Sequence, residues 1–471
     1  MSGREMMASI SPPTTEQAEG IAASADMGTM PAGQSWPSAR RAWTCVALLA
    51  CAHMINMFDN GLTGFLVTLI KADLQASDAE MSLLIGFAPV AFYALVGLPM
   101  ARLIDRYPRT IVMPIGSLFV GTFTLMCGLA QNFWQLFLAR MFVGSSATVN
   151  GPGFYSLLAD YFPPHKLSRA IAGMQVGFVL GTALASLLGG VLVAMAIGWG
   201  TSDWFGLTIR PWHKVYMVGA AGAFLVSLIL WSIKEPDRRE LATLKPGEKA
   251  KMMPVSETLH EVWRRRAVYL PLFLALGFMS LEMGGIAPWR VAFMERNYGW
   301  DVAKIGAWSA GTMLIFSLIG LPLGTWMTEF FQKRYDDAPV RAILVSWVIA
   351  LPFSVAGPLM PTGELMMLCT GVGITFAMAS AIPQNTAVQI ITPNRMRAQV
   401  TAMYLFMMTV VGGLGANLLT AISGALGGEA YLGEAMALAV AIMTPLAIIC
   451  VMTGLKPYAR EIRERREAGV M

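Results

Sequence analysis

Charge is scarce in this sequence. Only 13% of its 471 residues are Asp, Glu, Lys or Arg, while 55% are apolar. Soluble domains carry about 25% charged residues, because their surfaces face water. This composition excludes an ordinary soluble enzyme, and it indicates that lipid covers much of the chain.

The residues that metal, redox and nucleotide chemistry require are few or absent. The five cysteines all fall within apolar runs, where they are expected to pack as small apolar residues. The four histidines show no metal-ligand spacing, and no Gly-x-x-x-x-Gly-Lys-Ser/Thr loop is present to hold ATP. We therefore expect no catalytic residues, no metal and no cofactor, and we exclude a pump with its own nucleotide site.

The sequence does contain a long series of apolar runs. A helix that spans a membrane needs about 20 mostly apolar residues, and runs of this length recur from residue 42 almost to the end. The pattern predicts an all-α membrane protein with twelve transmembrane helices. The predicted spans are 42–69, 81–100, 111–130, 133–159, 168–197, 213–233, 268–294, 303–327, 341–360, 364–391, 398–424 and 433–455.

Basic residues gather on one side of these spans. The tails and the loops after spans 2, 4, 6, 8 and 10 hold 27 of the 34 Lys and Arg residues, and the opposite loops hold five. Because basic residues stay in short cytoplasmic loops, we expect both termini in the cytoplasm and a multi-pass protein of the cell inner membrane. The remaining two, Arg140 and Arg290, lie inside spans. The net charge of +5 thus reflects the basic residues of the cytoplasmic loops, and no nucleic-acid partner is expected.

An internal repeat organises the chain. The motif Gly-Leu-Pro closes spans 2 and 8 at an offset of 223 residues. The same offset superposes Asp59 on Glu282 and Asp78 on Asp301, and the latter two stand where helix N-caps are expected. The repeat predicts two pseudo-symmetric bundles of six helices.

Five segments follow from the repeat and the composition. Residues 1–41 read as a disordered cytoplasmic tail without a cleavable signal, because they lack a short apolar core. The 234–267 stretch is basic and carries an amphipathic run, which predicts a cytoplasmic linker with a surface helix. The predicted bundles are 42–233 and 268–455, and 456–471 is a basic cytoplasmic tail.

The loop after span 2 carries a recognisable pattern. Residues 101–109 read Ala-Arg-Leu-Ile-Asp-Arg-Tyr-Pro-Arg, which resembles the loop signature of the major facilitator superfamily. The resemblance implies a major facilitator fold and a gating loop that contains Asp105, Arg106 and Arg109. Such a loop can cap the cytoplasmic end of a neighbouring helix and lock the two halves through charge-assisted bonds that break on opening; a simple positive-inside anchor is the alternative.

Within that superfamily, the chain is similar to spinster-like transporters. The similarity rests on Asn-Met-Phe-Asp at 56–59 and on Leu-Leu-Ala-Asp-Tyr-Phe-Pro-Pro at 157–164. It implies coupling to protons and, less directly, substrates that are lipids or amphiphiles.

Four ionisable residues lie deep within the spans: Asp59, Arg140, Glu282 and Arg290. A charge at the bilayer centre costs about 3 kcal/mol or more, so such residues mark transport paths or pair with one another. A carboxylate removed from water takes up a proton more readily. We therefore predict proton coupling at Asp59 and Glu282, with a structural ion pair as the alternative.

Arg140 and Arg290 are predicted to bind substrate. Depth along the helices allows Arg140 either to contact a substrate anion or to pair permanently with Asp59. Arg290 lies eight residues from Glu282 on one helix, too far for a direct contact; snorkelling to the interface is its alternative role.

Two apparent helix breaks give further site candidates. Asn-Gly-Pro-Gly at 150–153 and Ile-Pro-Gln-Asn at 382–385 are predicted to interrupt spans 4 and 10 at corresponding depths. Unwound backbone at membrane depth is tolerated beside a cavity, although Gly and Pro also permit close packing and bends. The substrate-lining residues predicted on this basis are Asn150, Tyr155, Gln384 and Asn385, with Gln175, Tyr404 and Asn417 as weaker additions.

These features together predict a proton-coupled secondary transporter. It would move a small or amphipathic organic solute, preferably an anion, by alternating access. The alternative is a proton-driven exporter of lipid-like or toxic amphiphiles. The expected partners are the solute, protons and membrane lipid, and the protein is expected to act as a monomer.

Overall fold

The chain folds into long helices arranged side by side. The computed structural model describes residues 36–144, 146–204, 206–236, 255–393 and 396–467. In this part of the chain, eleven helical stretches are long and apolar enough to cross a membrane. The remaining predicted span consists of two shorter helices, α6 and α7. The prediction of twelve transmembrane helices is confirmed.

The helices before the linker form what we call the N half. Its elements are α2 (Ala39–Leu74), α3 (Asp78–Ser82), the π-helix η1 (Leu83–Phe87), α4 (Ala88–Arg106), α5 (Arg109–Cys127), α6 (Phe133–Val143), α7 (Ser146–Tyr161), α8 (Pro164–Gly198), β1 (Ser202–Trp204), β2 (Leu207–Ile209) and α9 (Pro211–Trp231). The two strands pair as an antiparallel hairpin, which the sequence analysis did not predict.

The helices after the linker form the C half. The predicted surface helix is α11 (Val255–Arg264). The C half contains α12 (Arg266–Tyr298), α13 (Val302–Gln332), α14 (Ala338–Ala356), η2 (Gly357–Leu359), α15 (Gly363–Ile391), α16 (Arg397–Gly413), α17 (Gly415–Leu426), η3 (Glu429–Tyr431) and α18 (Leu432–Glu467).

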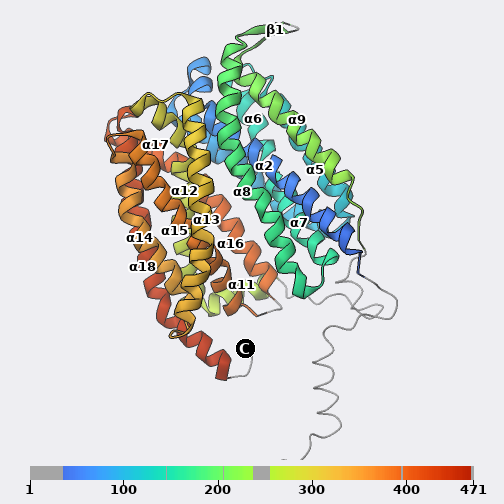
Figure 1. The fold of residues 1–471 in the computed structure, drawn as a ribbon, viewed down its shortest axis with the longest axis vertical. Helices are drawn as coiled ribbons and strands as arrows, with labels where there is room; N and C mark the ends of the chain where they lie inside the picture. Colours follow the sequence, from blue (N-terminus) through green and yellow to red (C-terminus); the bar gives the residue numbers. More distant parts are fainter. Residues whose placement is uncertain (1–35, 145, 205, 237–254, 394–395, 468–471) are drawn as a thin grey trace, which may run out of the picture.

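The two halves lie side by side, coloured blue to green and yellow to red in Figure 1. The β1–β2 hairpin lies at one end of the molecule, which we call the hairpin face. The α11 helix and the last turns of α18 lie at the opposite end, the tail face (Figure 1).

Close backbone approach holds neighbouring helices together. A Cβ atom on Gly177 of α8 would lie 2.1 Å from the Ala50 carbonyl oxygen of α2. A Cβ atom on Gly284 of α12 would lie 2.0 Å from the Gly412 carbonyl oxygen of α16. Only glycine fits at such crossings, where dispersion contacts between backbones stabilise helix pairs in lipid.

The predicted interruptions of spans 4 and 10 are wrong. Helix α7 continues through 150–153, and α15 continues through 382–385 with Pro383 inside it. A proline removes one backbone donor, and neighbouring helices can support the freed carbonyl without unwinding. Helix α6 ends at Val143 with Gly144 as its C-cap, and a Cβ atom on Gly144 would lie 2.0 Å from the Pro89 carbonyl oxygen of α4.

One of the two predicted N-caps is confirmed. The Asp301 side chain caps α13 by accepting a hydrogen bond from the Lys304 N–H at 2.8 Å. Asp78 does not cap α3: Ser77 does so, in a capping box with Glu80. The Asp78 carboxylate is thereby free to bind cations of other helices.

Candidate functional site

Asp59 lies on α2 inside the N half, with only 6% of its surface exposed. A Cβ atom on Gly219 of α9 would lie 2.6 Å from Asp59 Oδ1, so the carboxylate occupies the space that a side chain at this position would fill. The neighbouring α5 contributes Thr124, whose hydroxyl has no hydrogen-bond partner among the described residues. No hydrogen bond or ion pair to the Asp59 carboxylate is found in the described part of the chain.

Arg140 lies on α6 and is 4% exposed. Its guanidinium carbon lies 6.0 Å from the centroid of the Tyr216 ring on α9. Within the described ranges, its Nε and Nη1 atoms have no hydrogen-bond partner. It interacts electrostatically with Asp59, but no direct ion pair of 4.0 Å or less joins these two described residues. The predicted contact is thus a longer-range one.

Glu282 is placed like Asp59 in the other half. Its carboxylate accepts a hydrogen bond from the Thr444 hydroxyl of α18. Thr444 and Gly219 occupy similar positions in the last helices of the two halves, at an offset of 225 residues. Both carboxylates therefore face the sixth span of their own bundle, which agrees with the repeat. No Lys or Arg within the described ranges forms an ion pair with Glu282.

Arg290 lies on α12 and is half-buried. Its Nε atom has no partner among the residues described, and neither does the indole N–H of the preceding Trp289. As its spacing predicts, it forms no ion pair with Glu282 in the described structure. A guanidinium N–H that is buried without a hydrogen-bond partner carries a desolvation cost.

Three predicted polar residues gather toward the tail face. The Tyr404 hydroxyl of α16 donates a hydrogen bond to Asn385 Oδ1 of α15. Tyr155 lies six residues before the end of α7 and is 43% exposed. Gln384 forms a separate contact: its Nε2 donates to Ser380 Oγ on its own helix at 2.8 Å.

Arg109 ties three segments of the N half together. Its guanidinium binds the Asp160 carboxylate of α7, Ser156 Oγ at 2.7 Å and Glu235 Oε1 at 3.0 Å. Burial raises the pKa of Glu235, but bonds from the Thr110 N–H and from Arg109 outweigh burial and hold that pKa below its ordinary value. All three partners of Arg109 lie in the N half or at the start of the linker, so these bonds join segments of one half.

Three predicted residues cannot be placed at this level of detail. The side chains of Asp105, Arg106 and Asn150 lie outside the described residues.

A cluster of four charges joins the halves at the hairpin face, and the sequence analysis missed it. Lys71 Nζ of α2 lies 2.8 Å from Asp78 Oδ1 and also binds Glu429 of η3. Arg296 of α12 holds Asp78 with two bonds of 3.0 and 3.1 Å and lies 3.6 Å from Glu429. We call this set the four-charge cluster. Arg296 gave no signal in the sequence beyond its place in a loop.

Further contacts between the halves also lie toward the hairpin face. A Cβ atom on Gly190 of α8 would lie 2.4 Å from the Val302 carbonyl oxygen of α13. Ser82 Oγ of α3 donates to the Ala416 carbonyl of α17 at 3.0 Å. The hairpin face is therefore held closed by charge, hydrogen bonding and close packing.

The comparison with known families decides the identity of this fold. Residues 49–416 match the family described as Major Facilitator Superfamily. The chain belongs to the major facilitator superfamily. It is therefore a multi-pass membrane transport protein and not an enzyme.

Curated relatives of this facilitator include an efflux pump and a transporter of an organic acid. It is 26% identical over 430 residues to an MFS-type efflux pump of Mycolicibacterium smegmatis, covering 90% of this chain and 95% of the relative. It is 23% identical over 299 residues to a cis,cis-muconate transport protein of Acinetobacter baylyi, covering 63% and 68% of the two chains.

Solved structures support the fold of the facilitator. A bacterial homologue of the human lysosomal transporter Spinster, inward-facing and unoccupied, superposes with a TM-score of 0.72 at 23% identity, covering 91% of this chain and 98% of that chain. The occupied inward-facing form gives a TM-score of 0.66 at 22% identity, with 89% and 96% covered. The spinster-like resemblance is thus confirmed at the level of the fold.

Proposed function

We propose that this facilitator carries a small or amphipathic organic anion across the membrane, coupled to protons, by alternating access. The observation that carries this proposal is the environment of Arg140. A buried guanidinium with two unbonded N–H donors is costly to maintain, and a carboxylate ligand would accept a charge-assisted bond from one of these donors. A permanent Asp59–Arg140 salt bridge would instead bring the two groups within 4 Å.

Proton coupling is proposed for Asp59 and Glu282. Asp59 is buried and Glu282 is half-buried, and neither forms a direct ion pair with a described cation. Moving a charged carboxylate through a low-dielectric environment is unfavourable, so protonation would accompany a conformational change that encloses it further. Asp59 lies within electrostatic range of Arg140, which would couple the arrival of an anion to the release or uptake of a proton.

Substrate would reach these groups from the tail face. The inter-half contacts described above gather at the hairpin face, and Tyr155, Asn385 and Tyr404 lie toward the opposite opening. Together with Gln384 and Arg290, they are the proposed lining residues. The bias of Lys and Arg supports a cytoplasmic position for the tail face and both termini. The protein would lie in the inner membrane, and each monomer would form one transport path.

Gating at the tail face is proposed for the loop that contains Asp105, Arg106 and Arg109. The bonds from Arg109 to Asp160 and Glu235 hold the start of α5 against α7 and the linker. Rearrangement of these bonds would accompany closure of the tail face.

Export of amphiphiles is the second candidate function. It is favoured by the relative that is matched over 95% of its length, because that relative is an efflux pump. The anion proposal is favoured by the unbonded N–H donors of Arg140 and by the relative named as a transporter of cis,cis-muconate, a dicarboxylate.

The test is transport in proteoliposomes that contain the purified facilitator. A panel of labelled organic acids is offered with an inward or an outward proton gradient. We expect accumulation driven by the inward gradient, and loss of that accumulation in Asp59→Asn. Full gradient-driven transport by Asp59→Asn would remove Asp59 from the coupling step.

Arg140→Lys serves as the matched variant for the anion contact, because it keeps the positive charge and removes the paired N–H donors of the planar guanidinium. We expect a substrate affinity about tenfold weaker at an unchanged protein level, since one charge-assisted bond is worth about 1.5–3 kcal/mol. If organic acids fail to accumulate and amphiphilic dyes are extruded instead, the exporter is the better description.

A further inference from the structure

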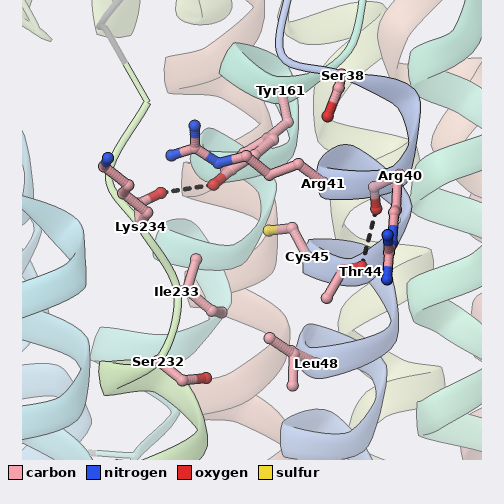
Figure 2. Close-up of a pocket in the computed structure, with 10 residues that line it drawn as sticks. All are labelled: Ser38, Arg40, Arg41, Thr44, Cys45, Leu48, Tyr161, Ser232, Ile233 and Lys234. Atoms are coloured by element: carbon pink, nitrogen blue, oxygen red, sulfur yellow. Dashed lines mark hydrogen bonds between the residues drawn. The ribbon is translucent and has the colours of Figure 1, made fainter.

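A cavity opens at the tail face of the N half, away from the proposed transport path. It has a volume of ≈ 300 Å³ and lies between the first turns of α2 and the segment that follows α9. Figure 2 shows its lining residues, among them Arg40, Arg41, Tyr161 and Lys234. Its size is at the lower end of the range for small-molecule pockets.

The cavity is lined by positive charge. Arg40, Arg41 and Lys234 contribute three cations, and no Asp or Glu is among the residues that line it. The Arg41 guanidinium reaches across to Tyr161 and Lys234, while Arg40 lies on the opposite edge (Figure 2). None of the three cations forms an ion pair with a carboxylate in the described structure. Such a cavity favours an anion that can be approached from two sides.

The depth of the cavity places it at the level of lipid headgroups. Trp43 of α2 and Trp231 of α9 stand beside the lining residues and are 46% and 55% exposed. Tryptophan gathers at membrane–water interfaces, where its ring faces the acyl chains and its N–H faces water. Leu48 and Ile233 form apolar walls on the membrane side of the basic residues.

We propose that this cavity binds the phosphate-bearing headgroup of an anionic phospholipid from the adjoining leaflet. Basic pockets between transmembrane helices on the cytoplasmic side suit such headgroups. The bound phosphate contacts Arg41 and Lys234, and the acyl chains lie against the apolar surface of α2 and α9. The lipid is a bound ligand rather than cargo, because Arg40 lies 19 residues from Asp59, about 28 Å along α2.

Binding of this lipid would join two segments of the N half. Lys234 belongs to the segment that leads into the linker, and its carbonyl oxygen accepts a bond from the Tyr161 hydroxyl of α7. A phosphate held by both Arg41 and Lys234 therefore fastens the start of α2 to the end of α9. The proposal does not depend on which solute the facilitator carries.

The test measures thermal unfolding of the full-length protein in detergent during titration with short-chain phosphatidylglycerol. Short-chain phosphatidylcholine, glycerol 1-phosphate and inorganic phosphate are titrated in parallel. We expect phosphatidylglycerol alone to raise the Tm. In Arg40→Gln/Arg41→Gln/Lys234→Gln, its apparent affinity should fall about fivefold for each charge removed, about a hundredfold in total.

Two further variants make the outcome decisive. Ser232→Trp keeps all three charges but fills the cavity, and it should also weaken the phosphatidylglycerol effect. Lys333→Gln/Arg334→Gln/Arg460→Gln removes three exposed basic residues elsewhere on the tail face and should leave the effect unchanged. Equal losses in this control and in the cavity variant would show general surface electrostatics and overturn the proposal. Equal stabilisation by inorganic phosphate would identify a free anion as the ligand and overturn the lipid assignment.

Discussion

Replacing Arg296 by Gln should open the hairpin face. Arg296 is the residue of the C half that holds Asp78 with two hydrogen bonds, and it also contacts Glu429. Glutamine cannot reproduce a charged, two-pronged contact. The four-charge cluster would then hold the halves together only through Lys71, so the population of the state that is open at the hairpin face should rise.

The size of this shift follows from the geometry. Hydrogen bonds between charged groups contribute about 1.5–3 kcal/mol each when shielded. The Arg296 and Asp78 side chains are 22% and 12% exposed, so solvent screens part of this. We take about 2 kcal/mol for the whole contact, which corresponds to a shift of about thirtyfold in the equilibrium between the two states.

Distance measurements between spin labels on the hairpin face provide the assay. One label is placed at Trp134 in the N half and the other at Glu434 in the C half, both exposed positions, in a background without the five native cysteines. Arg296→Gln should populate a longer distance that is rare in the parent protein.

Lys304→Gln is the matched control. It removes an ion pair with Glu364 of 3.1 Å that lies on the same face but within the C half. A distance distribution in Arg296→Gln that is unchanged from the parent would refute the reasoning. An equal shift in Lys304→Gln would also refute it, because general loss of charge would then be the cause.

Three further predictions concern single positions. Glu282→Gln keeps an acceptor for Thr444, so we expect a folded protein that exchanges solute between equal pools but loses gradient-driven accumulation; counterflow and uptake assays separate the two. Gly284→Ala should destabilise the protein by about 1–3 kcal/mol, because its Cβ would meet backbone at 2.0 Å. Gly311→Ala, with nothing within 4 Å, should leave the Tm unchanged. The lowered pKa of Glu235 means that its stabilising contribution is complete at neutral pH and is lost as the pH falls below the ordinary glutamate range. Glu235→Gln should therefore lower the Tm at pH 7 and bring it closer to that of the parent near pH 4.

The spans could be predicted because lipid leaves the backbone few choices. Every N–H and C=O in the hydrocarbon must be satisfied within the segment, so an apolar run of about 20 residues becomes a helix. The ends were less predictable: α2 begins at Ala39 and ends at Leu74, beyond both limits of the predicted 42–69. Outside the hydrocarbon, polar residues can continue a helix into water.

Helix breaks were poorly predicted from Gly and Pro. The Asn-Gly-Pro-Gly motif lies within α7, whereas α6 ends at Val143, where Gly144 lies close to the α4 backbone. Whether a helix unwinds depends on the neighbours that can support its freed backbone groups, and the local sequence does not contain those neighbours.

By itself, the sequence determined the twelve helices, the two related halves and the equivalence of Asp59 and Glu282, because apolar length and internal repetition are local properties of the chain. Only the tertiary structure decided that Arg140 stands apart from Asp59, that four charges close the hairpin face and that three cations surround a cavity. Lys71 and Glu429 are 358 residues apart in the chain. Electrostatic contacts depend on distances in space, and those distances exist only after the helices have packed.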